Sequence, residues 1–179
     1  MLSKLNVLEI RKDALDAVKD NASQFSFIAI YYIIPILIAS TLHLIKYDVD
    51  TRLFGNLISG ISLFAGLLFS IIFIVSNNLN TRREKIQTKN EEDIRYIETY
   101  KKFAKNIVSL ISYTVVKSVF IIIILIVSDA VYSYLDKEVN LFLRLLWDVL
   151  IIFLYHFIFY IILILKEMYS MQYEDISKS

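Results

Sequence analysis

Residues 53–76 contain no charged side chain, and this run constrains the fold more than any other feature of the sequence. An α-helix rises about 1.5 Å per residue, so a segment of this length crosses the roughly 30 Å hydrocarbon core of a bilayer. Three further apolar runs of similar length occupy residues 25–45, 107–128 and 145–165. Because a backbone in lipid must satisfy its own hydrogen bonds, the sequence predicts four transmembrane α-helices.

The composition supports one all-α membrane domain over residues 1–179. Hydrophobic residues make up 57% of the chain, and they are collected into the four runs instead of being dispersed at a helix or strand period. The absence of cysteine excludes a disulfide framework and a thiolate metal site. The net charge of +1 gives no basis for a nucleic-acid partner. We therefore expect a four-transmembrane-helix bundle in contact with the lipid bilayer.

Polar segments flank these spans. Residues 1–23 have the pattern of an amphipathic helix and lack the apolar core of a signal peptide, so we expect this helix to dock along the bundle or on a partner. Residues 77–106 form a charged loop and helix. No Gly or Pro interrupts residues 90–129, which predicts that the third helix extends beyond the membrane. Residues 166–179 form a short polar tail.

The distribution of Lys and Arg predicts the orientation. Most of the 19 Lys and Arg residues lie in the three segments 1–23, 77–106 and 166–179, whereas the two loops on the other side hold few. Positively charged loops face the cytoplasm. We therefore expect both termini and the charged helix on the cytoplasmic side of the membrane.

Small residues follow one line along the second span. They are spaced by three or four positions, which places them on one side of a helix: Gly55, Ser59, Ser62, Gly66 and Ser70. Small residues let helix backbones approach closely in lipid. The pattern predicts a central packing helix, and it leaves open whether the small residues meet other helices of the same chain or a second copy.

Ionisable residues inside the spans are the candidate functional residues, because an ionisable group in lipid is costly. Lys117 and His156 lie near mid-membrane at a similar depth on the third and fourth spans, and Tyr113 and Tyr160 share their faces. The spacing predicts a buried polar layer between these two helices. Lys117 then has either a conducting or gating role, or a purely structural role in which it snorkels or bonds carbonyls and tyrosine hydroxyls.

Three other positions near or within the spans carry alternatives. Pro35 removes the helical partner of the Tyr31 carbonyl, so we expect a kink that serves packing or acts as a gating hinge. His43 lies near the outer surface and is interpreted as an interfacial residue instead of a ligand. Asp148 is one turn from Arg144, which predicts a local ion pair between the two.

Motifs of enzymes are missing from the sequence. All three glycines lie in the second span, so none forms a phosphate loop, and the two histidines lie at different depths, so they do not form a metal site. We expect a non-enzymatic protein without cofactor, metal or direct nucleic-acid contact. On the charged helix, Ile94, Ile97 and Tyr100 are the candidate surface for a cytosolic protein partner.

The segment SGISLFAGLLFSIIF (residues 59–73) followed by the charged helix resembles the small multi-pass membrane subunits of bacterial anti-phage defence systems. These include Kiwa-type subunits and the membrane effectors that accompany retrons or cyclic-nucleotide signalling. The resemblance implies an oligomer that disturbs or monitors the inner membrane when a cytosolic partner signals infection.

Two classes of function are open. The first is an oligomeric, channel-like effector that packs through the small residues of the second span and is controlled by a cytosolic partner. The second is a scaffold or immunity-type protein that binds a partner through its charged helix. Lys117 matters in the first class only, whereas the surface of the charged helix matters in both.

Overall fold

The computed structural model describes residues 7–20, 23–45, 52–85, 91–134 and 140–177, and every element in these ranges is helical. This confirms the all-α prediction. In chain order the elements are α1 (Val7–Asp20), α2 (Gln24–Ile28), the π-helical segment η2 (Ala29–Ile33), α3 (Ile34–Leu44), α4 (Arg52–Lys85), α5 (Glu91–Tyr134) and α6 (Asn140–Ser177).

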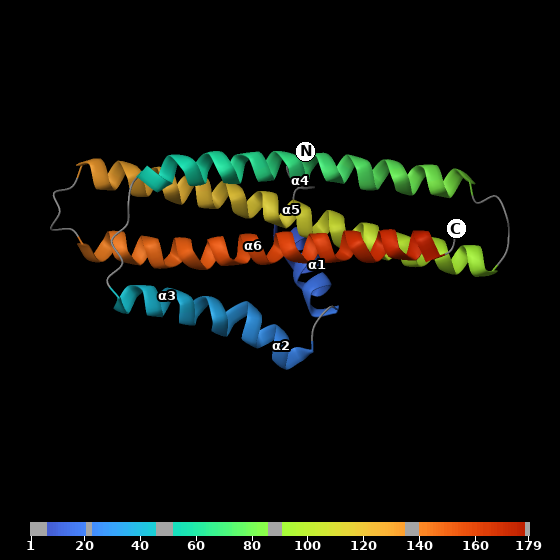
Figure 1. Cartoon of the computed structure of the whole chain (residues 1–179), viewed down its shortest axis with the longest axis horizontal. Coiled ribbons are helices and arrows are strands. Elements are labelled where there is room, and N and C mark those ends of the chain that lie inside the picture. The colour runs from blue at the N-terminus through green and yellow to red at the C-terminus, as the bar shows by residue number, and fades with distance from the viewer. Residues whose placement is uncertain (1–6, 21–22, 46–51, 86–90, 135–139, 178–179) are drawn as a thin grey trace.

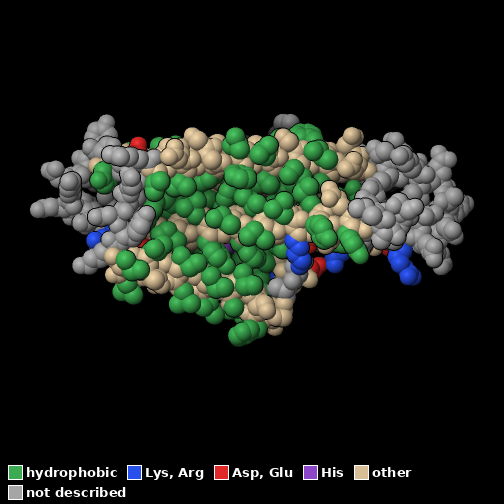
Figure 2. Space-filling model, viewed as in Figure 1, with side chains coloured by type: hydrophobic (Ala, Val, Ile, Leu, Met, Phe, Trp, Pro, Cys, Tyr) green, Lys and Arg blue, Asp and Glu red, His purple; other side chains and the backbone are tan. Residues whose placement is uncertain are grey.

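Four helical segments are long and apolar enough to cross a membrane, as predicted. They are Gln24–Leu44, Leu53–Asn78, Glu98–Tyr132 and Arg144–Tyr173. Figure 2 shows hydrophobic side chains over much of one face, with a few charged side chains right of its middle and near its ends. Many large apolar side chains of the spans are exposed to the surroundings, for example Leu37 at 59% and Ile162 at 60%. Such a surface is stable in lipid and not in water, so the chain is a multi-pass membrane protein.

The spans form an open row, and α5 is its central helix. Close contacts join α4 to α5, α5 to α6 and α6 to α3, so that α4 and α3 lie at opposite edges (Figure 1). The prediction that the span of α4 is the central packing helix is therefore wrong. The residues of α5 that are 0–1% exposed are Ile107, Leu110, Ile111, Thr114, Ser118, Ile121 and Leu125. A helix buried by partners on several sides needs this kind of continuous apolar face.

The short connection between the first two spans predicts that they are antiparallel neighbours, and the structure shows that they are not. The segment α3 packs on α6, and α6 and α5 separate it from α4 (Figure 1). The connecting residues 46–51 lie outside the described part of the chain.

Helix α1 crosses the row and packs on α5 (Figure 1). Its buried residues are Ala14, Ala17 and Val18, whereas Leu8, which the periodicity placed on the apolar face, is 71% exposed. Small side chains let α1 approach α5 closely. Two solvent-exposed ion pairs flank this contact, with Lys102 Nζ 3.0 Å from Asp20 Oδ2 and Lys105 Nζ 3.8 Å from Asp13 Oδ1. Of the two predicted docking sites for the N-terminal helix, the structure shows the one along the bundle.

A candidate polar site within the membrane

Lys117 of α5 is enclosed by aromatic rings in the middle of the membrane-spanning region. Its Nζ lies 4.8 Å from the ring centre of Tyr160, 4.9 Å from Tyr113, 5.7 Å from Tyr31 and 6.0 Å from Phe153. These rings come from α5, α6 and the π-helical segment η2. Lys117 is only 6% exposed. Three segments that are far apart in sequence thus meet at one ammonium group.

Aromatic rings, and not carboxylates, surround the amino group of Lys117. Among the residues that the structure describes, no Asp or Glu forms an ion pair with Lys117. A cation above an aromatic ring is stabilised by about 2 kcal/mol when both are desolvated. The nearby hydroxyls of Thr114 and Ser118 donate to carbonyls of their own helix, at 2.7 Å to Leu110 and 2.7 Å to Val115. The groups that can stabilise a protonated Lys117 here are therefore aromatic rings.

Two tyrosine hydroxyls connect the first span to α6 at this level. Tyr31 Oη and Tyr160 Oη are 3.1 Å apart, and the rings of Tyr113 and Tyr160 meet edge to face with centres 5.3 Å apart. Tyr160 is fully buried. The structure thus brings together the four predicted residues Lys117, His156, Tyr113 and Tyr160, and it adds Tyr31.

The first span contains a π-helical segment, Ala29–Ile33, shortly before its proline. An α-type bond from residue 35 would go to the carbonyl of Tyr31, and a π-type bond would go to that of Ile30, but proline has no N–H. The N–H of Ile34 is already bonded to the Ala29 carbonyl. Both the Ile30 and the Tyr31 carbonyls therefore need donors from elsewhere.

Two consecutive residues of α6 supply these donors. His156 Nε2 lies 2.9 Å from the Tyr31 carbonyl oxygen, and Tyr155 Oη lies 2.9 Å from that of Ile30. A carbonyl only accepts hydrogen bonds, so His156 carries its proton on Nε2. The rings of Tyr31 and His156 are also in contact, with centres 4.5 Å apart. The free carbonyls of Ile30 and Tyr31 in the first span are thus bonded by Tyr155 and His156 of α6.

The role of Tyr31 was not predicted from the sequence, although a signal for it was present. Tyr31 lies four residues before Pro35, so its carbonyl must find a partner outside its own helix. In lipid that partner has to be a donor on a neighbouring helix. His156 and Tyr155 were the available donors in the fourth span.

The line of small residues on α4 faces away from the rest of the chain. Gly55, Ser59, Ser62, Gly66 and Ser70 are all exposed, and a Cβ atom added at Gly55 or Gly66 would meet nothing within 4 Å. The side of α4 that packs on the chain is apolar and repeats every seven residues: Phe54, Ile61, Leu68 and Val75. The small residues therefore do not pack within this chain.

The predicted partner surface on α5 requires a correction. Tyr100 is 3% exposed and belongs to the same hydrophobic cluster as Ala14 and Ala17 of α1, so it is a core residue. Tyr100 does lie on an apolar face of α5, but helix α1 packs on that face. The side chains of Ile94 and Ile97 lie outside the described residues.

A second contact between the first span and α6 lies near the other end of the row. His43 Nδ1 is 2.8 Å from Asp148 Oδ2, and both side chains are partly exposed. His43 is thus a partner of Asp148 across two helices, in place of the local pair with Arg144 that the spacing favoured. Tertiary packing overrides an i, i+4 preference, which is worth only about 0.2–0.5 kcal/mol.

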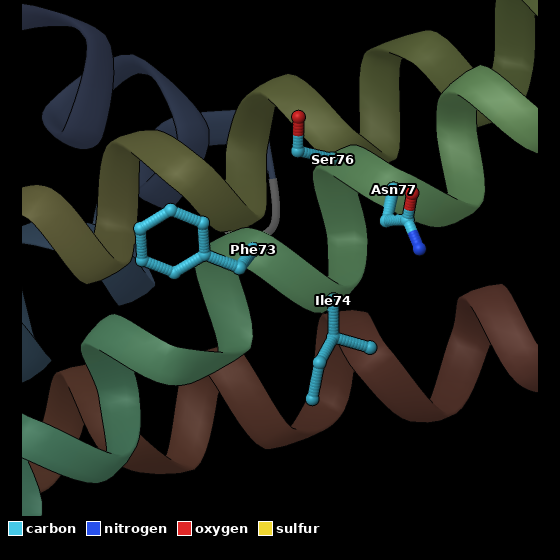
Figure 3. A pocket seen from close by; sticks show the side chains of 4 residues that line it. All are labelled: Phe73, Ile74, Ser76 and Asn77. Atoms are coloured by element: carbon cyan, nitrogen blue, oxygen red, sulfur yellow. The ribbon is translucent and has the colours of Figure 1, made fainter.

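Neither a metal centre nor a deep pocket stands out in the described part of the chain. No group of three His, Asp or Glu residues is close enough there to hold a metal ion. A groove of about 450 Å³ runs beside α4, lined by Phe73, Ile74, Ser76 and Asn77 (Figure 3). Phe73 and Ile74 are more than half exposed, so this groove is open to the surroundings and has no charged group in its lining.

No protein-family model, curated protein or solved structure matches this chain.

Proposed function

We propose that this protein is an oligomeric, non-enzymatic, channel-like effector of the bacterial inner membrane. Both termini and the extended end of α5 face the cytoplasm, where a protein partner controls the assembly. The distribution of Lys and Arg supports this orientation. The resemblance to membrane subunits of anti-phage defence systems supports infection as the signal.

The observation that carries the proposal is the enclosed ammonium group of Lys117. A Lys at the centre of a transmembrane helix costs about 2.5–3.5 kcal/mol on insertion scales. An apolar side chain at the position of Lys117 would avoid this cost. Ionisable groups within membranes mark ion pathways and gates, and Lys117 lies where the first span, α5 and α6 meet.

The outward line of small residues on α4 supports assembly into an oligomer. In lipid, apolar burial does not drive helix association, so close packing at small residues takes its place. The five small residues have no such role within the chain, as their exposure shows. We therefore assign them to the contact between copies of this chain.

The first test measures membrane potential in cells with a voltage-sensitive dye. The protein is induced alone and then together with the product of its neighbouring gene. We expect depolarisation with the wild type and none with Lys117→Leu at equal expression. Lys101→Leu, which changes an exposed lysine of α5, is the control and should behave as the wild type. Normal depolarisation by Lys117→Leu would refute the proposed role of this residue.

The second test concerns the oligomer and has a matched control within α4. Gly66→Leu places a large side chain on the line of small residues, whereas Gly60→Leu places the same side chain about 120° around the helix. An added Cβ meets nothing within 4 Å at either position, so both variants should fold. We expect crosslinking in membranes to show a smaller oligomer only for Gly66→Leu. Equal behaviour of the two variants would contradict the assignment.

One observation favours the alternative function, a scaffold or immunity-type protein. Helices α4, α5 and α6 continue beyond their apolar windows, to Lys85, from Glu91 and to Ser177. These extensions form a surface that a cytosolic protein can bind. If the alternative holds, charged substitutions at Ile94 and Ile97 abolish activity and Lys117→Leu does not.

A further inference from the structure

The charged groups of the spans are distributed unevenly with depth. The segments 25–45, 53–76, 107–128 and 145–165 contain one acidic residue, Asp148, and one lysine, Lys117. Asp148 precedes His156 on α6 by about 12 Å, and its carboxylate is bonded to His43. Glu167, which is buried, follows His156 by about 16 Å. At the depth of Lys117 the ionisable groups are therefore bases and tyrosines.

The polar groups at the site are suited to an anion. The Lys117 ammonium only donates hydrogen bonds. The hydroxyls of Tyr31 and Tyr160 share one hydrogen bond, which uses one of their two protons and leaves the other O–H to donate elsewhere. Rings of basic side chains in pores select anions, and carboxylate rings select cations. Within the four segments 25–45, 53–76, 107–128 and 145–165, no Asp or Glu lies at this depth.

We propose that the open state of this protein conducts anions and excludes cations, with small inorganic anions such as chloride passing Lys117. The inference rests on the channel-like function proposed above. In the described conformation the four rings cover the ammonium, which is 6% exposed, so this conformation is closed. If an ion passes about 5 Å from the Lys117 ammonium in a medium with an effective dielectric constant of about 20, the charge of Lys117 changes the occupancy of that ion by a factor on the order of 100.

The test uses the purified full-length protein, alone and with its partner protein, in vesicles of neutral phosphatidylcholine. The vesicles contain more KCl inside than outside, and a voltage-sensitive dye reports the sign of the potential. Anion selectivity makes the interior positive, because chloride leaves. We expect Lys117→Gln to lower the chloride-to-potassium permeability ratio by at least a factor on the order of 100, and Lys117→Arg to preserve it. Lys101→Gln is the control for a cation at the exposed surface.

The outcomes separate the inference from the function on which it rests. An interior-positive potential that Lys117→Gln abolishes supports both. A conductance that makes the interior negative, or one whose anion selectivity persists in Lys117→Gln, overturns the inference and leaves the channel-like function standing. If neither the protein alone nor the protein with its partner produces an ion flux, the proposed function is overturned, and the inference with it.

Discussion

The bond from His156 to the Tyr31 carbonyl should exist because of Pro35, and a double-mutant cycle tests this dependence. His156→Leu removes the donor, and Pro35→Ala restores a backbone N–H that can bond the same carbonyl in α-helical geometry. The two substitutions should therefore be coupled: the loss of His156 should be less harmful when residue 35 has its own N–H. Their sites meet at the Tyr31 carbonyl, 2.9 Å from His156 Nε2.

The expected coupling follows from what each variant leaves unpaired. His156→Leu alone leaves one buried carbonyl without a donor, which costs about 1–3 kcal/mol. In the Pro35→Ala background the same change loses mainly the contact between the rings of His156 and Tyr31, a contribution of about 0.5–1.5 kcal/mol. Interhelical hydrogen bonds in membranes average about 0.6 kcal/mol and reach about 1.7. We therefore expect a coupling free energy of about 1 kcal/mol.

The free energy of unfolding can be measured in detergent micelles by titration with a denaturing detergent. Tyr155→Phe is the matched control, because it removes the neighbouring donor, which bonds Ile30 instead. In an α-helix residue 35 bonds to residue 31 and not to residue 30. Tyr155→Phe should therefore couple to Pro35→Ala much more weakly than His156→Leu does.

Additive effects of His156→Leu and Pro35→Ala, within about 0.5 kcal/mol, would refute this reasoning. Equal coupling for the two donors would also contradict it, since one restored N–H cannot replace both.

Three further predictions concern other contacts of the fold. Ala17→Leu should overpack the contact between α1 and α5 and cost about 1–3 kcal/mol, which limited proteolysis of α1 would detect; no change in cleavage would show that this contact is loose. Tyr160→Phe should destabilise by about 1 kcal/mol, and adding Tyr31→Phe should cost little more, because the two share one hydrogen bond; additive losses in the same unfolding assay would argue against the pair. Asp148→Asn should cost less than about 1 kcal/mol, as the pair with His43 is partly exposed; a larger loss would mean that this pair is a main attachment of the first span.

Sequence reasoning predicted the spans closely because hydropathy and helix length act locally. The predicted span 25–45 corresponds to Gln24–Leu44, and 53–76 corresponds to Leu53–Asn78. The long third helix begins at Glu91, one residue after the predicted start. In lipid nearly all backbone groups bond within their own helix, so the sequence of one span is enough to locate it.

The candidate site was predictable in part. Lys117 and His156 were identified because ionisable groups in lipid are rare, and their depth followed from counting residues. The rings that enclose Lys117 include Tyr31, from a span that was expected to pack on α4. Which span supplies a ring depends on the order of the helices, and hydropathy contains no information about that order.

By itself, the sequence determined that this chain has four membrane-spanning helices, an amphipathic helix before them, and one lysine in their middle. The tertiary structure decided that α5 is central, that α3 packs on α6, and that the small residues of α4 face outward. Lipid tails are as apolar as the helices, so the rotation and the neighbours of each helix depend on close packing and on a few polar contacts. In this protein, the bonds from Tyr155 and His156 to the two carbonyls freed by Pro35 provide the contact that holds the first span beside Lys117.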